Sequence, residues 1–345
     1  MARRGDTHRM LRWLWTSRRL EARLARAVLV PAAVLWRGGM AARAMAYQRG
    51  WLAVRELPLP SVSVGNLTLG GSGKGALVEW IARHYADGGA TPAILVPGAP
   101  DEVRVHRHAV PGAIVLGDRD PVAGGERALA QGGTVLILDD AYQRLDVQRD
   151  LNLAVLSAET SRAVRWTLPA GPWREGWPAL RRAQGAIVTR KRAPLEAAEQ
   201  LARDLARVVP GPVGIVHLGL EHLEGLVSGE RRAAATLSGK RVVAASAVAD
   251  PDAFVAQTKA TGAAVQVATW KDRPDFRDED VAWLAHAARR ADHVVITEKD
   301  AVKLRDRWPH RVPEPLVAVL QLAWEAGGEE IAAALDAVVT PADRF

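Results

Sequence analysis

The sequence predicts an α/β protein that combines a P-loop-type domain built on a mostly parallel sheet, a second, smaller α/β domain and an N-terminal membrane-associated helical arm. Three observations lead to this prediction. Short β-branched runs alternate with helical patterns along most of the chain, which is typical of parallel sheets covered by helices. A glycine-rich segment stands between a predicted strand and a predicted helix. Basic residues are concentrated near the N-terminus.

The length and composition allow two folded domains after the arm. The chain has 345 residues, of which 48% are hydrophobic and 25% charged, as in ordinary globular proteins. It contains no cysteine, which excludes a disulfide framework, a thiolate metal site and a cysteine nucleophile. We expect the arm over residues 1–55, the P-loop domain over 56–209 and the smaller domain over 210–345, with Pro210-Gly211-Pro212 as the linker.

The arm is strongly basic and amphipathic. Residues 1–55 carry twelve arginines against Asp6 and Glu21, a net charge of about +10. Since the whole chain has a formal net charge of +7, the remaining residues sum to about −3. At 100° per residue, one helical stripe holds Trp13, Leu20, Leu24 and Val28, and an adjacent stripe holds Arg12, Arg19, Arg23 and Arg26. This pattern predicts a helix lying on an anionic membrane surface.

A spanning helix is not expected, because the apolar run from Ala27 to Trp36 has only ten residues and contains Pro31, whereas a span needs about 20. Two alternatives remain open, a helix packed on the protein's own core and a secretory signal. Nucleic acid is not expected as a partner, because nucleic-acid-binding proteins more often spread basic residues over a folded face.

The strands follow from the buried β-branched runs. In the P-loop domain they are expected at Ser61–Val64, Ala93–Val96, Ala113–Leu116, Thr134–Leu138, Leu151–Leu156 and Ala186–Thr189. In the smaller domain they are expected at Val242–Ala245, Ala264–Ala268, His293–Thr297 and Leu316–Leu320. Helices are expected over Arg192–Val209 and Asp278–Arg290.

The glycine-rich segment is a candidate phosphate-binding loop. Glycines let backbone N–H groups close on phosphate oxygens, and a lysine at a helix N-terminus adds positive potential. The candidate nucleotide-binding residues are Thr68, Gly70, Gly71, Ser72, Gly73, Lys74 and Gly75. Two positions depart from the usual pattern, because Thr68 replaces the first glycine and Gly75 replaces the hydroxyl residue that binds Mg²⁺. Ser72, Thr68 or a water could replace that hydroxyl, and a plain structural turn is the alternative.

Two carboxylates, Asp139 and Asp140, follow the predicted strand Thr134–Leu138, at the edge where parallel sheets bind ligands. One can hold Mg²⁺ and the other can accept a hydroxyl proton. The alternative is a turn or helix-capping role. For Thr297 and Asp300 we favour the capping role, with Thr297 as the N-cap.

Five ordered segments resemble the tetraacyldisaccharide 4′-kinase (lipid A 4′-kinase) family over nearly the whole chain. The similar segments are Ser63-Val-Gly-Asn-Leu-Thr-Leu-Gly-Gly-Ser-Gly-Lys74, Leu138-Asp-Asp-Ala-Tyr-Gln143, Arg149-Asp-Leu-Asn-Leu153, Leu168-Pro-Ala-Gly-Pro-Trp-Arg-Glu175 and Thr297-Glu-Lys-Asp-Ala-Val-Lys303. The resemblance implies a monotopic enzyme on the cytoplasmic face of the inner membrane. It implies transfer of the γ-phosphate of ATP to the 4′-hydroxyl of a tetraacyldisaccharide 1-phosphate lipid.

The resemblance also implies roles for individual residues. Lys74 and the loop glycines would hold the triphosphate, Asp139 and Glu175 would bind Mg²⁺, and Asp140 would act at the acceptor hydroxyl. Asp101 would be a further catalytic carboxylate. The remaining motif positions in the candidate site are Gln143, Arg144 and Arg174.

The chain departs from the family pattern near the chemistry. The position after Lys74 is glycine, the Ser-Arg-Gly-Tyr loop is shortened to Val96-Pro-Gly-Ala99, and Arg144 and Arg273 stand where the family has histidines. An arginine stays protonated near neutral pH, so it stabilises charge but cannot shuttle a proton. A catalytically impaired homologue that binds nucleotide or lipid at the membrane is therefore the alternative. A soluble P-loop NTPase with an unrelated acceptor is a third. The sequence predicts neither acyl-chain preference nor oligomeric state.

Overall fold

The computed structural model describes residues 10–11, 13–17, 19–98, 100–160, 164–248, 251–270 and 276–340. The chain forms two compact units. The larger unit comprises Arg9–His217 and Trp324–Phe345, and the smaller unit contains Leu218–Ala323. Strands β7 (Val213–Gly225) and β12 (Leu316–Ala326) each run from one unit into the other. The unit division thus falls inside two strands, whereas the sequence analysis placed a single boundary at the prolines before β7.

The larger unit is built on a parallel sheet with the strand order β7-β6-β5-β1-β4-β2-β3. All six predicted strands are present: β1 (Ser61–Asn66), β2 (Pro92–Val96), β3 (Ile114–Gly117), β4 (Val135–Asp139), β5 (Leu151–Ser157) and β6 (Gly185–Arg190). Every residue of β1, β2, β4 and β5 is buried, which explains their continuous apolar runs. Because β1 lies between β4 and β5, the turns after β1 and β4 meet at one sheet edge.

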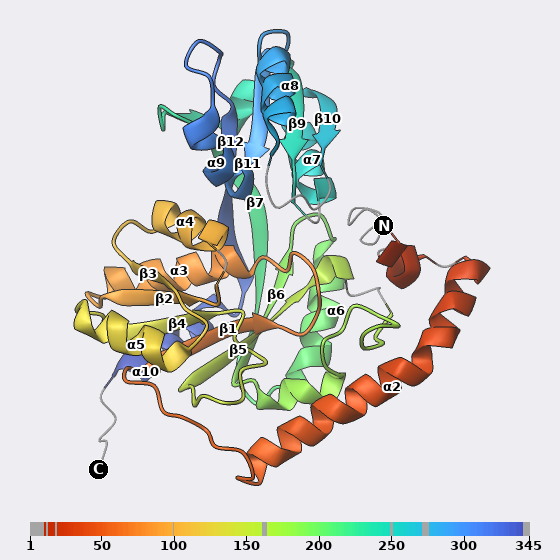
Figure 1. Cartoon of the computed structure of the whole chain (residues 1–345), viewed down its shortest axis with the longest axis vertical. Coiled ribbons are helices and arrows are strands. Elements are labelled where there is room, and N and C mark those ends of the chain that lie inside the picture. Colours follow the sequence, from red (N-terminus) through yellow and green to blue (C-terminus); the bar gives the residue numbers. More distant parts are fainter. Residues whose placement is uncertain are drawn as a thin grey trace. The chain divides into compact units, whose positions relative to one another are not determined.

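Helices cover this sheet, and all of them except the C-terminal helix connect its parallel strands (Figure 1). They are α3 (Lys74–Asp87), α4 (Pro100–Ala109), α5 (Pro121–Ala130), α6 (Leu195–Ala206) and α10 (Gly328–Val339). Helix α6 was predicted over Arg192–Val209 and is shorter, because Pro194 is its N-cap. The hydroxyl of Tyr85 in α3 donates to the Leu335 carbonyl of α10 at 2.9 Å, so the C-terminal helix belongs to this core.

The smaller unit is also α/β, which confirms the prediction of a second α/β region. Its strand order is β10-β9-β11-β12-β7, with the short strand β8 (Arg231–Ala233) antiparallel to β7. The other elements are β9 (Arg241–Ser246), α7 (Pro251–Ala260), β10 (Ala264–Thr269), α8 (Asp278–Ala288), β11 (His293–Thr297) and α9 (Glu298–Leu304). The capping role of Thr297 is confirmed, because its side chain accepts a hydrogen bond from the backbone N–H of Asp300.

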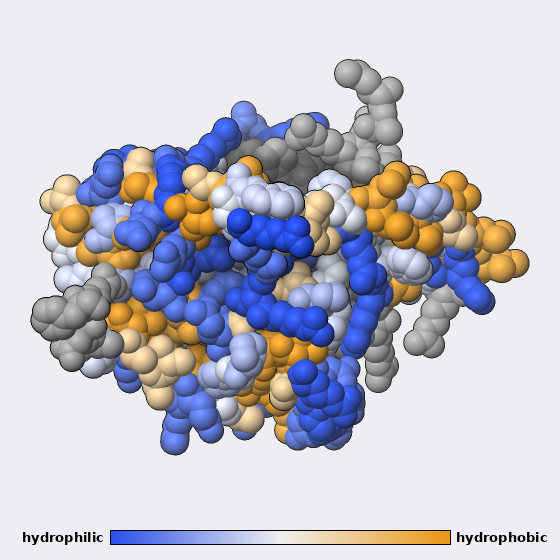
Figure 2. All heavy atoms as spheres, turned by 90° about the horizontal axis from the view of Figure 1, so that it is seen from below, coloured by the Kyte–Doolittle hydropathy of each residue, from blue (hydrophilic) through white to orange (hydrophobic). Residues whose placement is uncertain are grey.

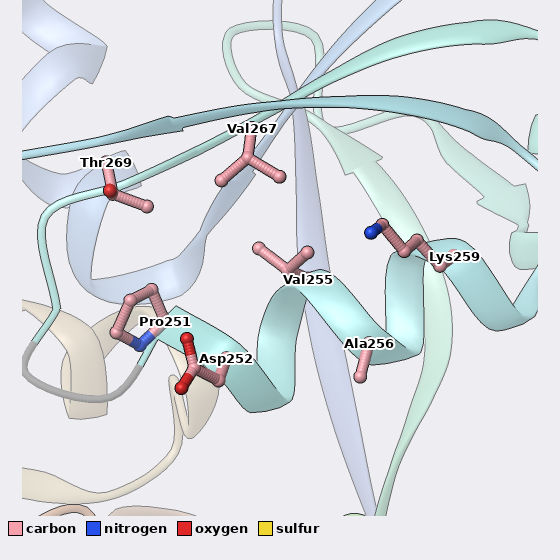
Figure 3. A pocket seen from close by; sticks show the side chains of 7 residues that line it. All are labelled: Pro251, Asp252, Val255, Ala256, Lys259, Val267 and Thr269. Atoms are coloured by element: carbon pink, nitrogen blue, oxygen red, sulfur yellow. The ribbon is translucent and has the colours of Figure 1, made fainter.

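A shallow pocket of about 350 Å³ lies in the smaller unit between helix α7 and edge strand β10 (Figure 3). Its lining mixes aliphatic side chains with one carboxylate and one ammonium group: Pro251, Asp252, Val255, Ala256, Lys259, Val267 and Thr269. None of the candidate site residues that the structure describes lines this pocket, and these residues all belong to the larger unit.

The arm contains a single long helix, α2 (Leu20–Gln48), which runs along the outside of the larger unit (Figure 1). The helix has 29 residues and continues through Pro31. The proline therefore does not end the helix, contrary to the expectation of a short apolar run. By length and composition it could cross a membrane, and only 11% of its most apolar stretch is buried. Length and composition alone do not separate a spanning helix from one that lies on a surface.

The predicted apolar stripe of the arm is exposed. Leu24 is 60% exposed and Val28 is 79% exposed, and Leu20, Val34 and Leu35 are exposed as well. Figure 2 shows apolar surface gathered at the end of the molecule toward which α2 extends in Figure 1. An exposed apolar stripe is expected of a helix that meets lipid rather than the protein's own core.

Candidate functional site

The glycine-rich loop joins the C-terminal end of β1 to the first turn of α3. Gly70 and Gly73 have φ values of 129° and 79°, in a region that side chains other than glycine rarely adopt. Gly73 is the N-cap of α3 and provides no side-chain hydrogen bond to it, and Lys74 is the first helical residue. The N–H groups of this turn and the Lys74 ammonium are therefore arranged as in anion-binding helix termini.

Side chains from neighbouring strands fix the loop. The Asn66 amide donates to the Thr68 carbonyl at 2.7 Å and to the Ser72 hydroxyl at 3.1 Å. The Thr189 hydroxyl at the end of β6 donates to the Ser72 carbonyl at 2.7 Å. Thr68 and Ser72 are buried. The two hydroxyls proposed as substitutes for the one missing at Gly75 are thus held within the loop's own scaffold.

A second ammonium group lies beside the loop, in the turn between β6 and α6. The Lys191 Nζ is 3.9 Å from the position that a Cβ on Gly71 would take. The backbone of this turn is held by Glu159, whose carboxylate accepts N–H bonds from residues 191, 192 and 193 at 2.7, 2.8 and 3.0 Å. Burial raises the pKa of Glu159, but these bonds and one from Ser157 together lower it by more, so that the pKa falls to about 2. The Lys191 ammonium therefore adds positive potential beside the loop, on a backbone that Glu159 holds in place.

Asp140 lies at the centre of an ion-pair cluster. The Lys74 Nζ is 2.5 Å from Asp140 Oδ1 and 3.1 Å from the Asn66 side-chain oxygen. The Arg174 guanidinium donates to both carboxylate oxygens of Asp140 at 2.9 to 3.1 Å and to the Gln143 side-chain oxygen at 3.2 Å. Asp140 has a φ of 51°, so the turn after β4 holds it in a left-handed conformation. Four candidate residues thus meet in one cluster.

Asp139, the last residue of β4, is buried beside a histidine that sequence analysis missed. His106 of α4 has its Nε2 at 3.5 Å from Asp139 Oδ2 and its Nδ1 at 3.0 Å from Glu79 Oε1. A Cβ on Gly75 would lie 3.7 Å from the His106 ring, so the imidazole stands between the substituted loop position and Asp139. Asp101 lies half-buried in the first turn of the same helix.

The acidic surroundings of His106 affect its protonation. Burial disfavours the imidazolium, but hydrogen bonds to Asp139 and Glu79 outweigh it and raise the pKa to about 9. A histidine whose pKa is higher in the folded than in the unfolded state stabilises the fold fully below its unfolded pKa, about 6.5. This contribution is lost as the pH rises through about 9.

His106→Gln is therefore expected to destabilise the protein by a few kcal/mol at pH 6 and by much less near pH 10, since glutamine never carries the charge. Thermal unfolding of both proteins across this range measures the difference. A difference that stays constant with pH would contradict a charged imidazole in the folded state.

Two further candidate residues have other surroundings than expected. Glu175, proposed for Mg²⁺, is 3% exposed and accepts two bonds from the Arg182 guanidinium at 2.9 and 2.8 Å. Arg144, proposed to replace a histidine, donates to both oxygens of Asp146 at 2.8 and 2.7 Å. Arg273 lies outside the described residues. Within the described ranges, no group of three or more acidic or histidine side chains is arranged to hold a metal ion.

Comparison with known proteins places these features in a family. The model of the tetraacyldisaccharide-1-P 4′-kinase family matches residues 25–111 and 98–340. A tetraacyldisaccharide 4′-kinase of Geobacter sulfurreducens is 33% identical over 311 residues, which cover 82% of this chain and 85% of that protein. Another from Anaeromyxobacter is 31% identical over 347 residues, with 92% of each chain covered.

A solved structure shares the fold. The crystal structure of LpxK from Aquifex aeolicus in complex with ATP matches with a TM-score of 0.71 and 23% sequence identity, over 91% of this chain and 99% of that one. The predicted P-loop-type α/β fold is thereby confirmed.

Proposed function

Because the chain belongs to the tetraacyldisaccharide-1-P 4′-kinase family, we propose that it transfers the γ-phosphate of ATP to the 4′-hydroxyl of a tetraacyldisaccharide 1-phosphate lipid. This is a step of lipid A biosynthesis. The observation that best supports the proposal is the cluster of Lys74, Asp140 and Arg174 beside the glycine-rich loop. The two cationic side chains can bind phosphate oxygens, and the carboxylate between them can accept a proton.

The loop N–H groups and Lys74 bind the triphosphate, and Arg174 stabilises the charge that develops on the transferred group. The acceptor oxygen forms a bond to the γ-phosphorus while the bond from this phosphorus to the bridging oxygen of ADP breaks. The proton of the acceptor hydroxyl passes to the Asp140 carboxylate. Asp101, on the helix that packs against Asp139, is proposed as a further carboxylate of the site.

When bound, Mg²⁺ would supply positive charge against the phosphate oxygens of the nucleotide. We propose Asp139 as its carboxylate ligand. A nucleotide-bound Mg²⁺ takes only one or two carboxylates and keeps phosphate oxygens and waters as its other ligands, so a single carboxylate at the strand end fits. Glu175 would join it only after leaving Arg182. A measurement of ATP affinity with and without Mg²⁺, in wild type and Asp139→Asn, tests this assignment, which predicts that only wild type responds to the ion.

The arm is proposed to attach the enzyme to the cytoplasmic face of the inner membrane. Its exposed aliphatic stripe and its arginines support binding to an anionic surface. Replacing Leu24 and Val28 together by aspartate is expected to weaken binding to vesicles of phosphatidylethanolamine and phosphatidylglycerol by about 100-fold or more, since each buried aliphatic side chain contributes about 1.5 kcal/mol or more. Co-sedimentation measures this. Leu195→Asp, at an exposed position on α6, is the matched control; equal binding by both proteins would contradict the proposal.

The function is tested by incubating the purified full chain with ATP, Mg²⁺ and the disaccharide lipid. Mass spectrometry is expected to detect the lipid with one added phosphate at the 4′ position. If ATP binds with no transfer to the lipid, the chain would be a catalytically impaired homologue instead. If phosphate appears only on a soluble acceptor, the lipid assignment would be wrong.

A further inference from the structure

Helix α2 contacts the candidate catalytic residues directly. The Trp36 indole Nε1 donates to the backbone carbonyl of Arg174 at 2.8 Å. The Arg43 guanidinium, two turns further along the same helix, donates to the backbone carbonyl of Gln143 at 3.0 Å. Both contacts join the arm to residues whose side chains point into the Asp140 cluster.

These two carbonyls lie at sensitive points of the site. The Arg174 guanidinium holds both oxygens of Asp140, and the Gln143 side chain connects Arg174 to Asn66 through bonds of 3.2 and 3.1 Å. A shift of either backbone would move the guanidinium that holds Asp140 or the amide that accepts a hydrogen bond from this guanidinium. The arm therefore contacts Asp140 through a single intervening residue, Arg174.

Further hydrogen bonds connect the arm to the segment that leads to Arg174. The Thr167 hydroxyl donates to the Ala33 carbonyl of α2 at 2.8 Å, and the indole of Trp15, which precedes α2 in the arm, donates to the Pro169 carbonyl at 3.0 Å. The buried residues of α2 are Ala22, Arg26 and Ala33, and Trp36 itself is 45% exposed. Hydrogen bonds are directional, so these contacts constrain both the position and the orientation of the segment.

We propose that Trp36 and Arg43 are positioning residues of the phosphotransfer site. They hold the backbone of Arg174 and Gln143, so the helix whose outer face is apolar also sets the geometry around Asp140. The inference rests on the proposed function of the Asp140 cluster. It assigns to α2 a role in turnover that is separate from attachment to the membrane.

The test replaces each donor with little change in bulk. Trp36→Phe keeps an aromatic ring but removes the pyrrole ring with its N–H group, Arg43→Gln removes the guanidinium, and Arg43→Lys restores a donor and the charge. We expect kcat for lipid phosphorylation to fall about tenfold in Trp36→Phe and in Arg43→Gln, with the KM for ATP within about twofold of wild type, because misplacing catalytic groups lowers turnover more than binding. Arg43→Lys is expected to recover part of the loss.

Amide hydrogen exchange of residues 168–175 in the full chain provides a readout apart from activity. Exchange is expected to accelerate in Trp36→Phe and to stay at the wild-type rate in Trp51→Phe, which alters another exposed tryptophan of the arm. Binding of Trp36→Phe and Trp51→Phe to vesicles of phosphatidylethanolamine and phosphatidylglycerol is measured as well. It separates a loss of membrane attachment from a loss of positioning at the site.

Two outcomes would overturn the inference. In the first, wild type phosphorylates the lipid and both donor variants keep its kcat and its exchange rates. In the second, kcat falls only in proportion to lost vesicle binding, equally in Trp36→Phe and Trp51→Phe. Absence of lipid phosphorylation by wild type would contradict the proposed function instead, and the exchange measurement would still decide whether α2 holds the segment.

Discussion

Lys74→Ala is expected to lower phosphate transfer to the lipid by about 10³-fold and to weaken ATP binding at least tenfold. The ammonium group lies at the first residue of α3, where it adds a full charge to the partial positive charge of the helix terminus. Without it, the loop N–H groups alone would meet the triphosphate. Steady-state kinetics and fluorescence titration with a labelled ATP analogue measure the two effects.

Lys240→Ala is the matched control, because Lys240 is an exposed lysine of the smaller unit, outside the candidate site. It is expected to behave as wild type. If Lys74→Ala bound and turned over ATP like this control, the glycine-rich segment would be a structural turn, and the proposed nucleotide site would have to be abandoned.

Asp140→Asn is expected to separate binding from turnover. Loss of the carboxylate removes the proposed proton acceptor, which lowers kcat by about 10² to 10⁴-fold. The same change releases Lys74 from the 2.5 Å ion pair, so ATP affinity is expected to rise rather than fall. Kinetics and the titration used for Lys74 measure both quantities.

The control for this variant is Asp204→Asn on α6, a surface aspartate paired with Arg165. A parallel fall in ATP affinity and kcat would contradict the assignment, because it would mean that Asp140 supports nucleotide binding rather than competing with it. An unchanged kcat would move the proton acceptor elsewhere, with Asp101 as the next carboxylate to replace.

The sequence predicted the parts of the site that depend on local pattern. Fully buried strands leave unbroken apolar runs, so the ends of β1 and β4, and with them the loop and Asp139, could be located from residues close together in the chain. The pairing of β1 with β4 then brings these ends together. The cap at Thr297 was predictable for the same reason, because it depends on residues three positions apart.

Contacts between distant residues could not be predicted in this way. His106 meets Asp139 and Glu79 only after two helices pack, and no local spacing indicates it. The pairs of Glu175 with Arg182 and of Arg144 with Asp146 are close in the chain, but they form outside α-helices and strands, where no regular spacing indicates them. The ten-residue apolar run from Ala27 to Trp36 did not indicate the 29 residues of α2, because the helix extends beyond this run at both ends and continues through Pro31.

The passage of β7 and β12 between the units has a consequence for anyone who wishes to dissect this enzyme. A chain truncated at residue 209, the boundary that the linker prolines suggest, would lose β7 and leave β6 with an open edge, which is a site for aggregation. It would also lose α10, including the carbonyl that accepts the Tyr85 hydroxyl bond. The ATP-binding half should therefore be made as residues up to 217 rejoined to 324 onward by a short linker, not as a simple N-terminal fragment.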